Sequence, residues 1–182
     1  MKTSSIYNEG RKLLLMGSSA YKMKELPLEV RERIDLGIEK GVVFVVAEAH
    51  GSCRLFQDYL ASKNYRDVVI GHAKSLRYNA GGWQDVKYGN NLKEREKNMI
   101  KDCDYAIVIW QDKSSVIAEN LEYLKKLRKS TFLYEYNSSD GTFQAGQLDP
   151  RRIFRKIFPF SKSFKQKEKK AFDKWFSEKL NQ

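Results

Sequence analysis

Small hydroxyl-bearing residues and glycines follow three apolar runs of the sequence, and their chemistry suits an anionic ligand. They are Gly17-Ser18-Ser19, Gly51-Ser52 and Ser114-Ser115. The first turn of a helix carries free N–H groups and a partial positive charge, so a phosphate or carboxylate is favoured there. These residues therefore predict a cradle for a phosphate or a ribose. Alternatively, Ser52 and Ser114 only cap their helices, which serines do routinely.

Charged side chains near these turns could neutralise a bound phosphate. Lys113, Arg77 and Arg95 are the candidate cations, and a guanidinium could hold two phosphate oxygens in a fork. Asp112 adds a carboxylate beside Lys113. Each of these residues, taken singly, could also be an ordinary solvated surface residue. We predict that they belong to the same ligand-binding site.

Glu48 is the best candidate for a catalytic residue, although the sequence assigns no reaction. It follows an apolar run, where a carboxylate could hold a ribose hydroxyl or act as a general acid or base. His50 lies in the same loop and could bind a ligand, catalyse, or stabilise the loop by a hydrogen bond. Glu119 and Glu122 are alternatives, but their spacing from nearby lysines favours ion pairs on a helix. No catalytic triad can be assembled from the two histidines of the chain.

Alternating strands and helices must position these residues. Apolar runs predict five strands, and helical periodicity predicts the segments between them. The predicted strands are 12–16, 42–46, 67–70, 105–110 and 131–136. The alternation predicts an α/β fold, a three-layer Rossmann-like sandwich with a mostly parallel five-stranded sheet and right-handed crossovers. Ligands of such sheets bind at the carboxyl ends of the strands.

The stretch 71–92 interrupts this alternation. It is long and polar, contains two adjacent glycines and shows no clean period. A loop of such length inside a compact α/β domain is usually functional or mobile. Trp83 and Tyr88 within it, and Trp110 at the end of a predicted strand, could stack on a nucleobase. Ordinary packing is the alternative for these aromatic residues.

Positive charge is concentrated in the last part of the chain. Of the net charge of +11, residues 150–182 contribute +8, from eleven Lys/Arg and three acidic residues. We predict a basic amphipathic helical extension over 150–182, joined through a linker at 137–149. Its basic and aromatic pattern could grip single-stranded nucleic acid or lie on an anionic membrane. It could equally dock on the rest of the protein or on a second subunit.

Composition restricts the cellular setting and the type of site. No stretch approaches the roughly 20 apolar residues of a membrane span, and the first residues lack the apolar run of a secretory signal. Cys53 and Cys103 lie apart, without metal-ligand spacing. We therefore predict a cytoplasmic protein with free thiols, no metal site and no cofactor.

Several segments in succession resemble the SLOG superfamily of Rossmann-like proteins, in particular its YspA-like branch. The matching pieces fall within roughly residues 10–136 and are Gly17-Ser18-Ser19, Glu48-Ala49-His50-Gly51, Arg77-Tyr78-Asn79, Gly81-Gly82-Trp83, Arg95 with Met99, Asp102-Cys103-Asp104-Tyr105, and Trp110 with Lys113-Ser114. The resemblance implies a Rossmann domain over 1–136, a nucleotide-like ligand and a homodimer. It adds Asn79 to the ligand site and also includes Trp110 there. It also implies a bacterial or phage protein, since some members are sensors in bacterial conflict systems.

The chain departs from the pattern of that superfamily at the start of one predicted helix. Relatives carry a Gly-Thr pair that lets a backbone approach a phosphate, where this chain has Val116-Ile117. The catalytic glutamate of the glycosidase branches falls on Asn120, and an amide is neither a nucleophile nor a general base.

We therefore expect a protein that binds a nucleotide or a nucleotide-derived small molecule, as a sensor or a non-catalytic relative of nucleotide-processing enzymes. One alternative is a nucleotide N-glycosidase or phosphohydrolase that uses Glu48. The other is a single-stranded nucleic-acid-binding protein that uses residues 150–182.

Overall fold

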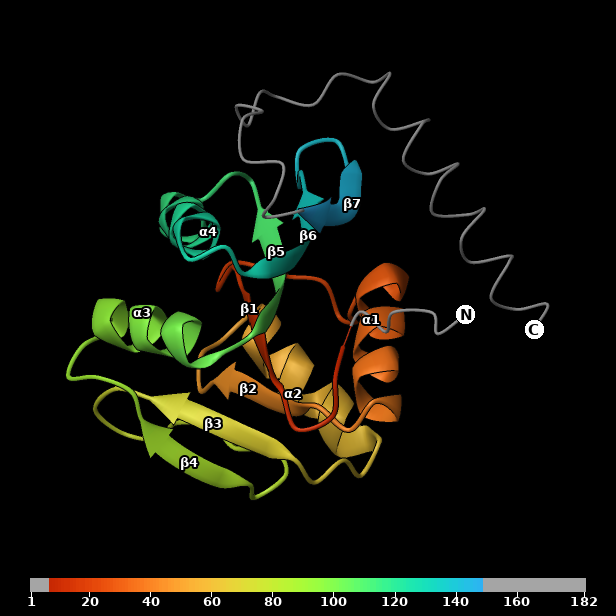
Figure 1. Ribbon diagram of the computed structural model, residues 1–182. Helices are drawn as coiled ribbons and strands as arrows, with labels where there is room; N and C mark the ends of the chain where they lie inside the picture. The colour runs from red at the N-terminus through yellow and green to blue at the C-terminus, as the bar shows by residue number, and fades with distance from the viewer. Residues whose placement is uncertain (1–6, 149–182) are drawn as a thin grey trace. The chain divides into compact units, whose positions relative to one another are not determined.

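The computed structural model describes residues 7–148, in which seven strands form one sheet (Figure 1). The strands are β1 (Lys12–Gly17), β2 (Val43–Ala47), β3 (Val68–His72), β4 (Gln84–Lys87), β5 (Tyr105–Gln111), β6 (Ser130–Tyr136) and β7 (Phe143–Leu148). Their order across the sheet is β4-β3-β2-β1-β5-β6-β7. All neighbours pair in parallel except β6 and β7, which are antiparallel. The predicted extension 150–182 lies outside the described residues.

Helices cover both faces of this sheet (Figure 1). They are α1 (Leu28–Glu39), α2 (Ser52–Ser62), α3 (Leu92–Asp102) and α4 (Ser115–Lys126). The crossovers from β1 to β2 and from β2 to β3 step toward one edge, whereas those that lead to β5 and β6 step toward the other. Because such crossovers are right-handed, α1 and α2 lie on one face and α3 and α4 on the opposite face. The predicted α/β sandwich with a mostly parallel sheet is confirmed.

The predicted count of five strands is wrong, because the two additional strands are edge strands with little apolar sequence. β4 lies within the stretch 71–92 that was expected to be a loop, and its sequence is Gln-Asp-Val-Lys. β7 lies within the expected linker 137–149, with the sequence Phe-Gln-Ala-Gly-Gln-Leu. An edge strand is partly exposed, and polar residues on it protect the protein from unwanted pairing. The same polarity removes the apolar signal on which a sequence-based prediction depends.

The core lies in the middle of the sheet, where strands are covered on both faces. Leu13, Leu14 and Leu15 of β1 have no exposed surface, and neither do Val45 and Ile107 of the neighbouring strands. Parallel strands buried on both faces have continuous apolar runs, which is why these strands could be predicted from sequence.

Polar side chains fasten the stretch between β3 and β4 to the rest of the domain. Gln57 of α2 is fully buried and donates from Nε2 to the carbonyl oxygen of Ala47 at 3.0 Å. Its Oε1 accepts the backbone N–H of Ala80 at 3.1 Å. Asn79 accepts the backbone N–H of Trp83 at 3.0 Å and donates to its carbonyl oxygen at 2.7 Å. Trp83 is itself buried, so it packs in the core and offers no face to a nucleobase.

Candidate functional site

The turns that follow β1, β2 and β5 meet at the carboxyl edge of the sheet. β1 and β5 are neighbours, and the chain departs from them toward opposite edges. This is the topological switch point at which open α/β sheets bind ligands. Ser18 Oγ accepts the backbone N–H of Gln111 at 2.9 Å and lies 3.4 Å from Ser114 Oγ. Ser52 Oγ donates to the carbonyl oxygen of Ser18 at 3.2 Å, so the three hydroxyl-bearing turns are brought together as expected.

Two glycines allow this close approach. A Cβ on Gly51, whose φ is +68°, would lie 2.4 Å from the carbonyl oxygen of Ser19. A Cβ on Gly17 would lie 2.5 Å from Ser52 Oγ and 2.6 Å from the carbonyl oxygen of Ile109. Both glycines are therefore explained by the packing of one turn against the next.

The serines at this edge divide into two groups. Ser18 and Ser52 are 4% and 0% exposed, and their hydroxyls are engaged in the contacts that join the turns. They hold the site together and do not line a ligand cradle. Ser19, Ser115 and His50 are exposed at the same edge, while Ser114 is half-buried. Any ligand bound here would meet this second group.

Glu48, the candidate catalytic residue, is the centre of a charged cluster at the end of β2. Its side chain is 2% exposed. Arg95 of α3 donates from Nη1 to Oε1 at 2.7 Å. Arg77 donates from Nε to Oε2 and from Nη2 to Oε1, the latter at 3.2 Å. Since both oxygens accept hydrogen bonds from arginines, a substrate proton could reach this carboxylate only after Arg77 moved away.

The cluster extends to Glu96, which the sequence analysis missed. Arg95 Nη2 donates to Glu96 Oε1 at 2.6 Å, and Asn120 Nδ2 donates to Glu96 Oε2 at 3.2 Å. Asn120 is 6% exposed, so its amide joins α4 to α3 in the interior. The sequence does contain a signal for the burial of Arg95. This residue precedes the apolar Met99 by four positions and therefore lies on the same buried face of α3. We call Glu48, Arg77, Arg95, Glu96 and Asn120 the Glu48 cluster.

The loop after β5 directs Asp112 and Lys113 apart from this cluster. Both residues have left-handed backbone conformations, with φ of 51° and 50°. Asp112 accepts the backbone N–H and the hydroxyl of Ser138, both at 2.7 Å. The Ser138 N–H, its hydroxyl and the Gln111 amide together lower the pKa of Asp112. Lys113 remains 60% exposed, with Nζ 3.9 Å from Glu135, so it is a surface cation at the start of α4.

Two further predicted ligand residues have structural partners. Trp110 is 8% exposed, and its ring N–H donates to the carbonyl oxygen of Ser114 at 3.0 Å. It therefore supports the loop before α4 and presents little surface for stacking. Asn79 closes the turn before β4 through its two hydrogen bonds to Trp83.

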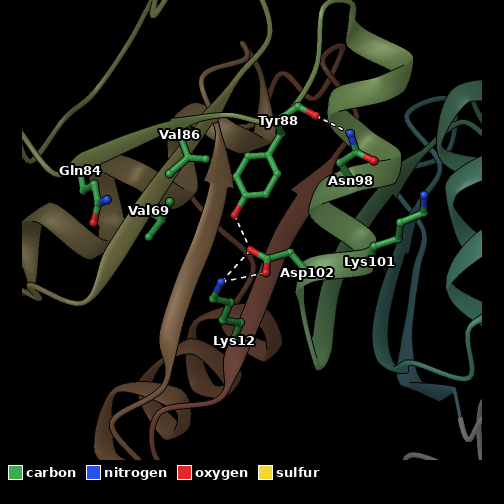
Figure 2. A pocket seen from close by; sticks show the side chains of 8 residues that line it. All are labelled: Lys12, Val69, Gln84, Val86, Tyr88, Asn98, Lys101 and Asp102. Atoms are coloured by element: carbon green, nitrogen blue, oxygen red, sulfur yellow. Dashed lines mark hydrogen bonds and ion pairs between the residues drawn. The ribbon is translucent and has the colours of Figure 1, made fainter.

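A separate hollow lies near the amino ends of the strands, on the face that carries α3. Its volume is about 720 Å³, and Lys12, Val69, Gln84, Val86, Tyr88, Asn98, Lys101 and Asp102 line it (Figure 2). Lys12 Nζ bonds both carboxylate oxygens of Asp102 at 2.8 Å, and the Tyr88 hydroxyl donates to the same carboxylate at 2.5 Å (Figure 2). Of the residues considered for ligand binding, Tyr88 alone lines this hollow, and its hydroxyl is bonded to Asp102.

Other site chemistries find little support in the described part of the chain. Within residues 7–148, no three His, Cys, Asp or Glu side chains gather in a way that could hold a metal ion. No helix in that range combines the length and the apolar character needed to cross a bilayer. Cys53 and Cys103 are buried free thiols, and burial raises the pKa of Cys53 to about 12.

Comparison of the chain with protein-family models, with curated proteins and with solved structures finds no match. The resemblance to the SLOG superfamily therefore stays a prediction. Function has to be inferred from the geometry and chemistry of the site itself.

Proposed function

We propose that this protein binds a nucleotide or a nucleotide-derived small molecule at the carboxyl edge of its sheet, as a cytoplasmic, SLOG-like sensor or non-catalytic relative of nucleotide-processing enzymes. The observation that supports this best is the meeting of the α2 and α4 N-termini on either side of Ser18. The N–H groups of a first helical turn favour an anion, and here two such turns begin beside the same residue. A phosphate is the ligand group that suits this environment.

Side chains near these two helix starts could supply charge and hydrogen bonds for the remainder of such a ligand. Lys113 lies at the start of α4 with a largely exposed side chain. Arg77 is 45% exposed although it is paired with the buried Glu48. Its guanidinium could exchange the carboxylate for a phosphate and keep a two-point hydrogen bond. The exposed Ser19 and His50 are polar partners for a ribose or a base.

The Glu48 cluster supports binding without turnover. Glu48 is held by two arginines, and Asp112 is held by the turn after β6. Asn120 uses its amide to bond Glu96. A general base needs a free acceptor within reach of the substrate, and these carboxylates are already engaged.

A thermal-shift screen of the full chain with nucleotides, cyclic dinucleotides and ADP-ribose derivatives tests the proposal. A ligand that binds the folded state, added at a concentration of about ten times its Kd, should raise the melting temperature by about 3–5 °C. The proposal fails if no nucleotide stabilises the protein at millimolar concentration. Turnover of a stabilising nucleotide would instead establish the enzyme alternative. Salt-dependent binding of single-stranded oligonucleotides, lost when residues 150–182 are removed, would establish the nucleic-acid alternative.

A further inference from the structure

β4 ends the sheet on one side and presents an unpaired strand edge. It is the first strand in the order across the sheet, and Figure 1 shows it at the margin with no element of residues 7–148 beyond it. Gln84, Asp85 and Lys87 are exposed, and Val86 is partly exposed. The N–H and C=O groups of such an edge are a template for one more strand.

The direction of the backbone groups identifies the two residues that face outward. The N–H of Tyr88 donates to the carbonyl oxygen of His72 at 2.9 Å, so Tyr88 turns its N–H toward β3. Backbone groups alternate in direction along a strand. Val86 therefore also faces β3, while Asp85 and Lys87 direct N–H and C=O away from the sheet. The two outward-facing positions thus carry opposite charges.

This charge pattern is complementary to itself. Two copies of β4 can pair antiparallel in three registers that set outward-facing residues opposite each other. One register sets Asp85 against the partner's Asp85, and another sets Lys87 against the partner's Lys87. Both put like charges directly opposite each other, which is unfavourable. The third sets Asp85 against the partner's Lys87 and, by symmetry, forms that favourable pair twice.

The favourable register also joins apolar surface. It sets Val86 against the partner's Val86 on the twofold axis, at a position where antiparallel Cα atoms are about 4.5 Å apart. Val86 and Val69 line the same hollow beside α3 (Figure 2). A second copy would therefore cover the valine that β4 exposes on this face and place the two hollows side by side.

We propose that two copies of this chain associate through β4, antiparallel to the partner's β4, and form one continuous sheet across a twofold axis. A twofold contact requires the same surface on both copies, and a self-complementary strand edge meets that requirement. A four-residue strand buries little area, so the affinity of the dimer should be low and the dimer should form only in concentrated protein solutions. The contact is independent of the proposed ligand site, since β3 and β2 separate β4 from β1 and the turn that follows it.

Sedimentation of the full chain at low salt, from about 1 μM to about 500 μM, tests this pairing. Asp85→Lys should weaken the dimer at least about tenfold, because it sets two lysines opposite each other twice. The double substitution Asp85→Lys, Lys87→Asp restores opposite charges and should restore association. Asp85 also lies 3.0 Å from His72 Nε2. Both variants lose that contact, so the comparison isolates the charges across the interface.

Oxidative cross-linking gives an independent readout of the register. Val86→Cys should form an intermolecular disulfide, because facing Cβ atoms on the twofold axis lie at bridging distance. Val69→Cys is the control, since it lines the same hollow one strand further in. Cys53 and Cys103 are buried and do not compete. A chain that stays monomeric throughout the concentration range, a dimer that Asp85→Lys leaves intact, or no cross-link at Val86→Cys would overturn the proposal.

Discussion

Arg95 Nη1 donates to Glu48 Oε1 at 2.7 Å, and this buried ion pair ties α3 to the carboxyl end of β2. The two side chains are 5% and 2% exposed. Each charge also has a second partner, since Arg95 bonds Glu96 and Glu48 bonds Arg77, so the buried charges of the cluster are balanced. The pair therefore fixes the position of α3 relative to the edge of the sheet where the candidate site lies.

Replacing Glu48 by Gln should strongly destabilise the protein. Arg95 would keep Glu96 as a partner but would lose its charged hydrogen bond to Glu48, as would Arg77, and this should cost about 1.5–3 kcal/mol. Denaturant unfolding measures the loss. Glu119→Gln is the control, because Glu119 is 67% exposed and its contact with Lys93 is a surface pair. A Glu48→Gln variant as stable as the control would show that the cluster contributes little to the fold.

Ser18→Ala should cost about 1–3 kcal/mol of unfolding free energy, because it leaves the buried N–H of Gln111 without its 2.9 Å acceptor. Ser19→Ala changes the exposed neighbouring serine and should stay within about 0.5 kcal/mol of the native protein. Chemical denaturation of the two variants makes the comparison. Equal stability would mean that water replaces the Ser18 hydroxyl without loss.

Gly51→Ala should damage the fold much more than Gly82→Ala. Both glycines have positive φ, so each substitution strains the backbone. The new Cβ at Gly82 meets nothing within 4 Å, whereas at Gly51 it meets the carbonyl oxygens of Ser19 and Ser18 at 2.4 and 2.6 Å. Melting temperatures and soluble yields of the two variants should therefore differ clearly. Similar losses would contradict the close packing of the turns.

Asp112 should stabilise the protein above pH 4 and lose this effect in acid. The Ser138 N–H lowers the pKa of Asp112 in the folded state, with help from the Ser138 hydroxyl and the Gln111 amide. A depressed folded-state pKa gives stability that is present above the unfolded pKa and is lost as the pH falls through the folded one. Unfolding of the native protein and of Asp112→Asn, measured from about pH 6 to about pH 2.5, should show a difference that disappears at low pH. A pH-independent difference would contradict this assignment.

Lys113→Ala should weaken binding of any nucleotide found in the screen by about 5–10-fold, since it removes one charge beside the phosphate. Lys126→Ala is the matched control, at the opposite end of α4 and exposed. Titration calorimetry gives both affinities, and both variants should melt as the native protein does. Equal affinities would place the phosphate elsewhere than at the start of α4.

The central strands could be predicted because burial on both faces imposes a continuous apolar run. The predicted strand 12–16 differs from β1 by one residue, and the predicted 131–136 differs from β6 by one. β4 and β7 were not predicted. They are edge strands that pair on one side only, so their side chains do not have to form a continuous apolar run. Backbone hydrogen bonds to β3 and β6 define these two strands, and a single sequence carries little trace of those bonds.

The candidate site could be placed from the sequence but not resolved in detail. Strand ends mark the edge where turns must gather, so the meeting of the Ser18, Ser52 and Ser114 turns follows from the topology. Which partner each side chain takes depends on contacts between distant segments. Glu48 and Arg95 are 47 positions apart in the chain, and no spacing rule connects them. Asp112 has the carboxyl group that a catalytic acid needs, but its oxygens accept hydrogen bonds from Ser138 in the turn after β6.

The clamp that Gln57 makes on the stretch before β4 consists of an uncharged amide. Its two hydrogen bonds are therefore insensitive to ionic strength and to protonation, unlike the ion pair between Arg77 and Glu48. Salt or a competing anion could detach Arg77 while the backbone that carries it keeps its shape. We therefore expect that Arg77 can exchange Glu48 for an anion without local unfolding of the segment that carries it.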